Sequence, residues 1–325
     1  MLGLCLAATP AGAAEWGGSM GAGLAYSDNV ERVPDGNSVT VATADLAGQL
    51  TDSGRTFDLD LEGAVILREY LDSAYENDVL PQFRGEVNWA PAPERFVWTI
   101  RENFGQVALT PADSLQPSDR QDVNVFSSGP ALTLPLGRRW NIQFTGLYSD
   151  VYYEDDEFDN NRLTGTMTVE RQVSSNQAAY VRAYSSRSEF KEAQFGGYDI
   201  QGLFLGYDGL GVRTGISAEI GVEELHDRDE VNEAAYVDLN IDRRLSHRLS
   251  ASLRLVTRYA DAAEIFALDQ DLEPQLGGTS NIQVSGDPIS QDRASLELNW
   301  EGLRTTAGAM LMWSSEDTDS TTYPD

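Results

Sequence analysis

The chain has 325 residues and a formal net charge of −29, from 52 acidic and 23 basic side chains. This excess of acid excludes the basic surface that a nucleic-acid-binding protein needs, so we expect no nucleic-acid partner. The single cysteine, Cys5, excludes a fold built on disulfides or on a thiolate metal site, and 41% apolar residues exclude a disordered chain.

Residues 1–14 resemble the end of a secretory signal peptide. A short apolar stretch around Leu4 and Leu6 is followed by small residues up to Ala13 and Ala14, although no basic segment precedes it. We therefore predict a signal peptide over 1–14 and one β domain over 15–325. No later apolar run approaches the roughly 18 residues of a transmembrane helix. The remaining classes are a soluble exported β protein and a membrane β-barrel, because only helices and closed barrels span a bilayer.

The dominant pattern after the signal peptide is strict alternation of apolar and polar residues. In 247–260 the odd positions from Leu249 to Tyr259 carry mostly apolar side chains, whereas Arg254 and Arg258 lie on the other face. A period of two predicts strands with one apolar and one polar face. We place fifteen strands near 16–26, 39–51, 55–71, 79–89, 95–105, 121–136, 139–153, 161–173, 177–188, 197–207, 211–223, 232–244, 247–260, 289–301 and 304–314.

The connections between these strands alternate between short and long. Membrane barrels show this alternation, with short periplasmic turns and long outer loops, and their tilted strands are also about ten residues long. The sequence therefore predicts an all-β, transmembrane, up-and-down antiparallel β-barrel in the bacterial outer membrane. Bacterial barrels have even strand numbers, and residues 320–325 have a loop composition. We accordingly expect fifteen strands of an intended sixteen, with a C-terminal truncation.

Aromatic residues mark both ends of the predicted strands. Trp89, Trp98, Trp140 and Trp300 lie towards the short turns. Tyrosines lie towards the long loops: Tyr26, Tyr70, Tyr148, Tyr152, Tyr153 and Tyr259. Two such sets predict the aromatic girdles at the two membrane interfaces. The alternative is a set of ordinary core aromatics in a soluble β protein.

Two stretches resemble the type 2 β-barrel porin family, which includes outer-membrane barrels encoded with exopolysaccharide synthesis and export genes. One is Tyr26-Ser27-Asp28-Asn29-Val30, and the other runs from Tyr152-Tyr153-Glu154 to Asp159-Asn160-Asn161-Arg162. Tandem long hairpins extend the likeness over the whole mature chain. The resemblance implies an outer-membrane location and a porin-like or polysaccharide-export role, without catalytic residues. The missing closing strand departs from the family.

Enzymatic chemistry finds little support in the residues. The only histidines, His226 and His247, fall on opposite sides of the predicted membrane, so they cannot cooperate in catalysis. We expect no enzyme activity and no cofactor. Acidic loop residues could bind divalent cations weakly, or be bridged by them to lipopolysaccharide phosphates, but they lack the spacing of a dedicated calcium loop. The candidates are Asp155, Asp156, Glu157 and Asp159.

The polar faces of the strands predict a pore wall. Charges of both signs suit a water-filled lumen, because burying them dry and unpaired costs several kcal/mol each. The pore-lining candidates are Glu62, Arg84, Glu86, Arg101, Arg182, Arg213, Glu219, Asp238, Asp242, Arg254, Arg258 and Glu297. About sixteen strands leave room for an aqueous channel.

These patterns predict a porin-like channel for hydrophilic solutes, with exopolysaccharide export as one setting. Its expected partners are outer-membrane lipid and lipopolysaccharide, a hydrophilic solute or polysaccharide, and further copies in a homo-oligomer. Two alternatives remain open at this point. One is a non-conducting barrel that anchors an envelope assembly through its outer loops, and the other is a soluble exported β-sandwich.

Overall fold

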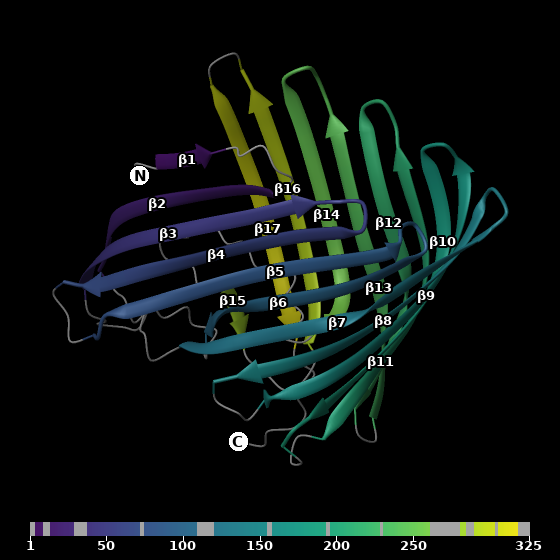
Figure 1. Cartoon of the computed structure of the whole chain (residues 1–325), viewed down its shortest axis with the longest axis horizontal. Coiled ribbons are helices and arrows are strands. Elements are labelled where there is room, and N and C mark those ends of the chain that lie inside the picture. Colours follow the sequence, from purple (N-terminus) through teal and green to yellow (C-terminus); the bar gives the residue numbers. More distant parts are fainter. Residues whose placement is uncertain are drawn as a thin grey trace.

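A computed structural model shows the chain as a single curved sheet (Figure 1). It describes residues 4–8, 14–28, 38–71, 75–108, 120–154, 158–192, 196–227, 230–260, 280–283, 289–302 and 305–317. Within those ranges, no helix has the length and apolar character needed to cross a membrane.

Fifteen long strands make up the sheet among the described residues. They are β2 (Ala14–Ser27), β3 (Val39–Ser53), β4 (Phe57–Tyr70), β5 (Asp78–Ala92), β6 (Phe96–Ala108), β7 (Arg120–Leu136), β8 (Trp140–Tyr153), β9 (Asn160–Ser174), β10 (Gln177–Phe190), β11 (Gly197–Leu210), β12 (Thr214–Asp227), β13 (Glu230–Arg244), β14 (Leu249–Ala260), β16 (Ile289–Glu301) and β17 (Thr306–Asp317). Each overlaps one of the fifteen strands placed from the sequence, so that prediction is confirmed.

Two short strands were not expected from the sequence. β1 (Leu4–Ala8) pairs antiparallel with β2, inside the stretch predicted to be a signal peptide, whose cleavage stays a prediction. β15 (Ser280–Gln283) pairs in parallel with the end of β6, where Ser280 lies opposite Val107. Part of the long connection between β14 and β16 therefore reaches a strand far from both of them in the sheet.

The long strands follow an up-and-down order. Each pairs antiparallel with the next in the chain, and β14 pairs with β16 across the long connection. In such a meander every second connection lies on the same edge of the sheet. The short turns therefore share one edge, which we call the turn edge, and the long connections share the other, the loop edge.

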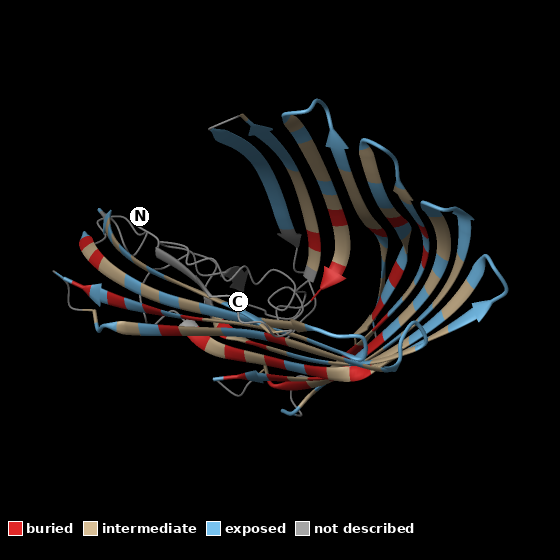
Figure 2. Ribbon diagram, turned by 45° about the horizontal axis from the view of Figure 1, so that its top comes forward, coloured by how far each residue is buried: buried red, intermediate tan, exposed pale blue. Residues whose placement is uncertain are grey.

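The two faces of the sheet have the reverse of the polarity found in a soluble protein. On β12, Ile220 and Val222 are 57% and 59% exposed, whereas Glu219 and Glu223 are only 6% and 4% exposed. Figure 2 shows buried and exposed residues alternating along these strands. Alternate residues of a strand point to opposite faces, so apolar side chains line one face and polar side chains the other.

The polar face is the concave one. Arg182 on β10 contacts Glu219 on β12, although β11 lies between these strands. It also donates a hydrogen bond to Tyr236 on β13, across both β11 and β12. Side chains of strands that are not neighbours meet only on the side towards which a sheet curls. We call this the inner face, and the apolar side the outer face.

Candidate functional site

The strand register places the predicted lining residues on one continuous face. Residues directly opposite one another in an antiparallel pair share a face. A chain of such pairs runs from Arg101 through Ser127, Ser149 and Arg162 to Ser188, across β6 to β10. Further pairs place the remaining strand residues on the same face: Glu62 with Arg84, Glu86 with Arg101, Glu219 with Asp238, Asn240 with Arg254, and Ser252 with both Asp242 and Glu297.

Arg213 is the exception among the predicted lining residues. The sequence placed it at the start of a strand, but β12 begins at Thr214, and Arg213 lies exposed in the turn before it. Its carbonyl accepts a hydrogen bond from the backbone N–H of Arg244 at 2.8 Å, so the backbone here extends the pairing of β12 with β13 into the turn. The alternating pattern runs through Gly211 and Val212 into the turn, which is why it misplaced the strand start.

An acidic hollow lies on the inner face of β3 to β5. It has a volume of about 490 Å³, and its charged lining consists of Asp58, Asp60, Glu62, Glu86 and Arg84. Four carboxylates outnumber the one guanidinium, so the hollow favours cations over anions.

Glu86 is held in a hydrogen-bonded chain along the wall of this hollow. The Nε of Arg101 lies 2.6 Å from one carboxylate oxygen of Glu86, and Asn88 donates to the other oxygen at 2.6 Å. Thr99 in turn donates to the Asn88 side chain at 2.7 Å. These contacts connect β5 to β6 and fix the orientation of Glu86.

Arg182 forms the centre of a second group, on β10 to β13. It makes two hydrogen bonds to Glu219, one of them from its Nε at 3.1 Å. Its guanidinium lies 4.6 Å from the ring centre of Phe204 and 5.9 Å from that of Tyr236. The side chain of Glu219 is 8% exposed and that of Arg182 is 26% exposed. Desolvated pairs of this kind hold a wall rigid, because both charges have found partners.

The third group is open to solvent, on β13 to β16. Ser252 donates to Asp242 at 2.6 Å, and Asn299 donates to Glu297 at 2.6 Å. Arg254 is exposed between them on the same face. Among the described residues Arg254 forms no ion pair with a carboxylate, so its charge is available to a passing ion.

A ladder of hydroxyl groups along β7 to β10 was not found by sequence reasoning. The hydroxyls of Ser127 and Ser149 lie 2.8 Å apart, and those of Thr164 and Ser186 lie 3.0 Å apart. Arg162, which is only 8% exposed, donates to Ser188 at 3.1 Å. Serine and threonine at inward positions were the only signal, and such residues are too common in strands to mark a network.

At the loop edge, Lys191 joins two carboxylates just beyond the end of β10. Its Nζ lies 3.1 Å from Asp150 and 3.3 Å from Asp159. Burial lowers the pKa of Lys191, but the hydrogen bonds and charges of the two carboxylates outweigh it and raise that pKa above its ordinary value of 10.5. Asp159 also accepts a hydrogen bond from the backbone of Tyr153 at 2.7 Å.

The other residues singled out from the sequence are only partly covered. Asp155, Asp156 and Glu157 lie outside the described residues. His226 is the last residue but one of β12, at the loop edge, and His247 lies in the short turn after β13, so the two imidazoles lie at opposite edges of the sheet. Within the described ranges, no three histidine, cysteine or acidic residues are grouped so as to hold a metal ion.

The girdle predicted from tyrosines is correct for half of its members. Tyr26, Tyr148 and Tyr152 are 71%, 46% and 49% exposed on the outer face. Tyr70, Tyr153 and Tyr259 are buried instead. For Tyr153 the reason is that consecutive residues of a strand point to opposite faces, and Tyr152 already faces outward. Tyr259 instead belongs to a buried cluster with Tyr198, Ile200 and Leu225.

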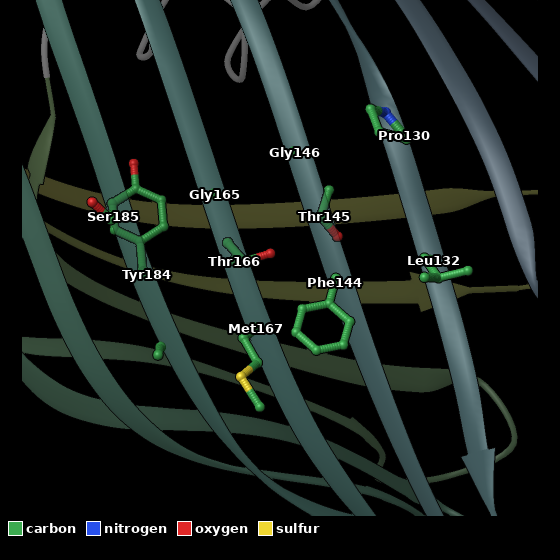
Figure 3. Close-up of a pocket in the computed structure, with 11 residues that line it drawn as sticks. Pro130, Leu132, Phe144, Thr145, Gly146, Gly165, Thr166, Met167, Tyr184 and Ser185 are labelled. Carbon is green, nitrogen blue, oxygen red and sulfur yellow. The ribbon is translucent and has the colours of Figure 1, made fainter.

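A separate hollow of about 490 Å³ lies on the outer face of β7 to β10 (Figure 3). Leu132, Phe144 and Met167 surround it, and the positions of Gly146 and Gly165 leave it open, with no atom within 4 Å of where a Cβ would lie. Its lining is apolar and faces away from the charged groups. It is therefore no part of a path for hydrophilic solutes.

Comparisons with known proteins do not assign the chain to a family. No family model matches it, and neither does any curated protein. Among solved structures, the ferric yersiniabactin uptake receptor FyuA from Yersinia pestis aligns over 97% of this chain and 69% of its own, with 9% identity and a TM-score of 0.41. The siderophore receptor PiuA from Acinetobacter baumannii aligns over 94% of this chain and 57% of its own, with 8% identity and a TM-score of 0.37. Likeness at this level identifies neither a relative nor a ligand for this chain.

Proposed function

We propose that this protein is an integral outer-membrane β-barrel that lets hydrophilic solutes pass along its inner face. The observation that carries the proposal is the reversed polarity of the two faces. Leu203, Leu205 and Ile220 are 58%, 58% and 57% exposed on adjacent strands, while Glu219 beside them is buried. Each Å² of such apolar surface costs about 25 cal/mol in water. Apolar surface on this scale favours lipid as the surrounding medium.

The height of the apolar belt fits an outer membrane. On β8 the outward positions from Trp140 to Tyr148 are apolar, aromatic or glycine, and the next outward residue is Asp150. Eight residues extend about 27 Å along a strand. At a strand tilt of about 40° this corresponds to roughly 21 Å across the bilayer, close to the ~25 Å apolar band of bacterial barrels.

The inner face supports passage of solute rather than catalysis. Acidic groups gather in the hollow on β3 to β5, and exposed groups of both signs continue on β13 to β16. Water and polar or charged solutes can replace one another along such a wall at little cost in solvation. On this proposal, the partners of the protein are outer-membrane lipid, lipopolysaccharide and a hydrophilic solute. Membership of the type 2 porin family, a polysaccharide solute and a homo-oligomer rest on the sequence resemblance.

A non-conducting barrel is the second candidate. The buried pairing of Arg182 with Glu219 favours it, because such contacts consolidate a wall without needing water beside it. In that case the long loops would act as anchoring points for other envelope proteins.

Single-channel conductance of the full-length protein in planar bilayers distinguishes the two candidates. Stable steps with mild cation selectivity are expected for the channel, and Arg254→Glu should raise that selectivity. Arg187→Glu is the matched control, because Arg187 is exposed on the outer face of β10 and the substitution changes the charge by the same amount. A folded, heat-modifiable barrel without conductance would leave only the structural candidate.

A further inference from the structure

The short turns have a charge opposite to that of the chain. The described turn residues are 54–56, 93–95, 137–139, 175–176, 211–213, 245–248, 302 and 305. They contain six arginines and a single acidic residue, Glu94, although acidic residues outnumber basic ones 52 to 23 in the whole chain. We call these arginines the basic rim: Arg55, Arg95, Arg138, Arg139, Arg213 and Arg248.

The guanidinium groups of the basic rim are exposed and uncompensated. All six residues are exposed, as the colouring of the turns in Figure 2 shows for this edge of the sheet. None of the six takes part in an ion pair within the described part of the chain. Arg243 and Arg244, also exposed, end β13 beside this rim. Positive charge that is gathered at one edge without acidic partners attracts an external anion.

A row of tryptophans lies directly beside the basic rim on the outer face. Trp16, Trp89, Trp98, Trp140 and Trp300 are 49%, 52%, 38%, 44% and 40% exposed, and each lies near the turn-edge end of its strand. The guanidinium carbon of Arg171 lies 5.4 Å from the ring centre of Trp140. Tryptophan is favoured at the level of lipid headgroups, where one part of the ring is apolar and the N–H is wet. This row therefore places the basic rim at headgroup depth.

The loop edge has the opposite character. Glu69, Glu189, Glu224 and Glu233 are exposed at outer-face positions near the loop-edge ends of their strands. Those carboxylates repel anions. Among the described residues, arginines without an acidic partner gather at the turn edge, whereas the exposed Arg187 and Lys191 near the loop edge each contact carboxylates.

We propose that the basic rim binds the headgroups of anionic phospholipids in the leaflet that meets the short turns. The proposal rests on the membrane location given under the proposed function. The adjoining tryptophan row and apolar belt favour lipid over an acidic polypeptide, because they bring phosphate groups, rather than a soluble partner, to the depth of the arginines. Each arginine near an anionic lipid surface should strengthen the association by about fivefold.

Fluorescence quenching by brominated lipids tests the proposal with the protein's own tryptophans. The full-length protein is folded into phosphatidylcholine vesicles that contain either brominated phosphatidylglycerol or brominated phosphatidylcholine at the same mole fraction. Stronger quenching by the brominated phosphatidylglycerol is expected, with a preference that declines as salt rises. The triple variant Arg243→Gln, Arg244→Gln, Arg248→Gln should lose most of the preference contributed by its hairpin. Arg254→Gln, on the inner face of the same hairpin, should leave it unchanged.

The outcomes separate this inference from the proposed function. Equal quenching by the two lipids in the wild-type protein overturns the rim proposal alone and points to an acidic polypeptide at the short turns. A preference that is as strong in the triple variant as in the wild-type protein, or that ignores salt, also overturns it. Quenching by neither lipid removes the membrane location itself. Heat-modifiable migration on gels shows that each variant has folded, and the salt dependence of the wild-type protein tests the proposal without any substitution.

Discussion

Replacing Ile220 by arginine tests the membrane location most directly. Ile220 lies on the outer face of β12, opposite Leu205 on β11 and Val237 on β13, and it is 57% exposed. It is the seventh residue of the strand, so about 20 Å of chain separate it from the turn edge. At a tilt of about 40° this places it roughly 15 Å into a belt of about 25 Å, close to the bilayer midplane.

The expected cost of Ile220→Arg follows from that depth. An arginine facing lipid at the midplane of a barrel lowers the free energy of unfolding by about 2–4 kcal/mol. The same change at an exposed site in water stays within about 0.5 kcal/mol. The two environments therefore predict results that differ by more than the error of a good unfolding curve.

Denaturant unfolding of the protein folded into lipid vesicles, followed by tryptophan fluorescence, measures this cost. Glu224→Arg is the matched control, because Glu224 lies on the outer face of the same strand but two outward positions closer to the loop edge. Its expected cost is about 0–1 kcal/mol, the value for the interface. If Ile220→Arg costs no more than Glu224→Arg, the apolar face does not meet lipid and the membrane argument fails.

Two further substitutions test the inner face and the loop edge. Arg182→Met should lower the free energy of unfolding by about 3 kcal/mol, because it leaves the buried carboxylate of Glu219 unpaired. Adding Glu219→Leu should restore most of the lost stability. A double variant that is no more stable than the single variant would contradict this pairing. Lys191→Met should cost less than about 1 kcal/mol at pH 7, because the lysine is 42% exposed. Its pKa is raised in the folded state, so its contribution is complete below the unfolded-state value and should disappear as the pH rises through the folded-state value, which unfolding curves at several pH values would detect.

Strand positions and strand order were predictable because local information determines them. In 249–260 the polarity of most side chains indicates which face they occupy, and a period of two leaves little freedom in the assignment. Connection lengths then predicted which strands were neighbours. The start of β12 was misplaced by three residues because Gly211, Val212 and Arg213 continue the alternation into the turn.

The contacts inside the candidate pore could not be read from the sequence. Arg182 meets Glu219 37 residues away because the sheet curls, and no local pattern encodes the curvature that brings β10 near β12. The pairing of β15 with β6 is similarly non-local, since more than 170 residues separate Ser280 from Val107. Alternation predicts the face of a residue but not its partner on a strand that is not its neighbour.

The net charge of −29 describes the chain as a whole and conceals the basic rim. The distance between the two edges of the sheet explains how an acidic chain can have a basic rim. The 14 residues of β12 extend about 45 Å, whereas electrostatic interactions in physiological salt are screened over about 8 Å. The acidic loop edge and the arginine-rich turn edge are therefore electrostatically independent surfaces. A partner at either edge responds to the local charge, so a strongly acidic barrel can hold anionic lipid at one end while it attracts cations at the other.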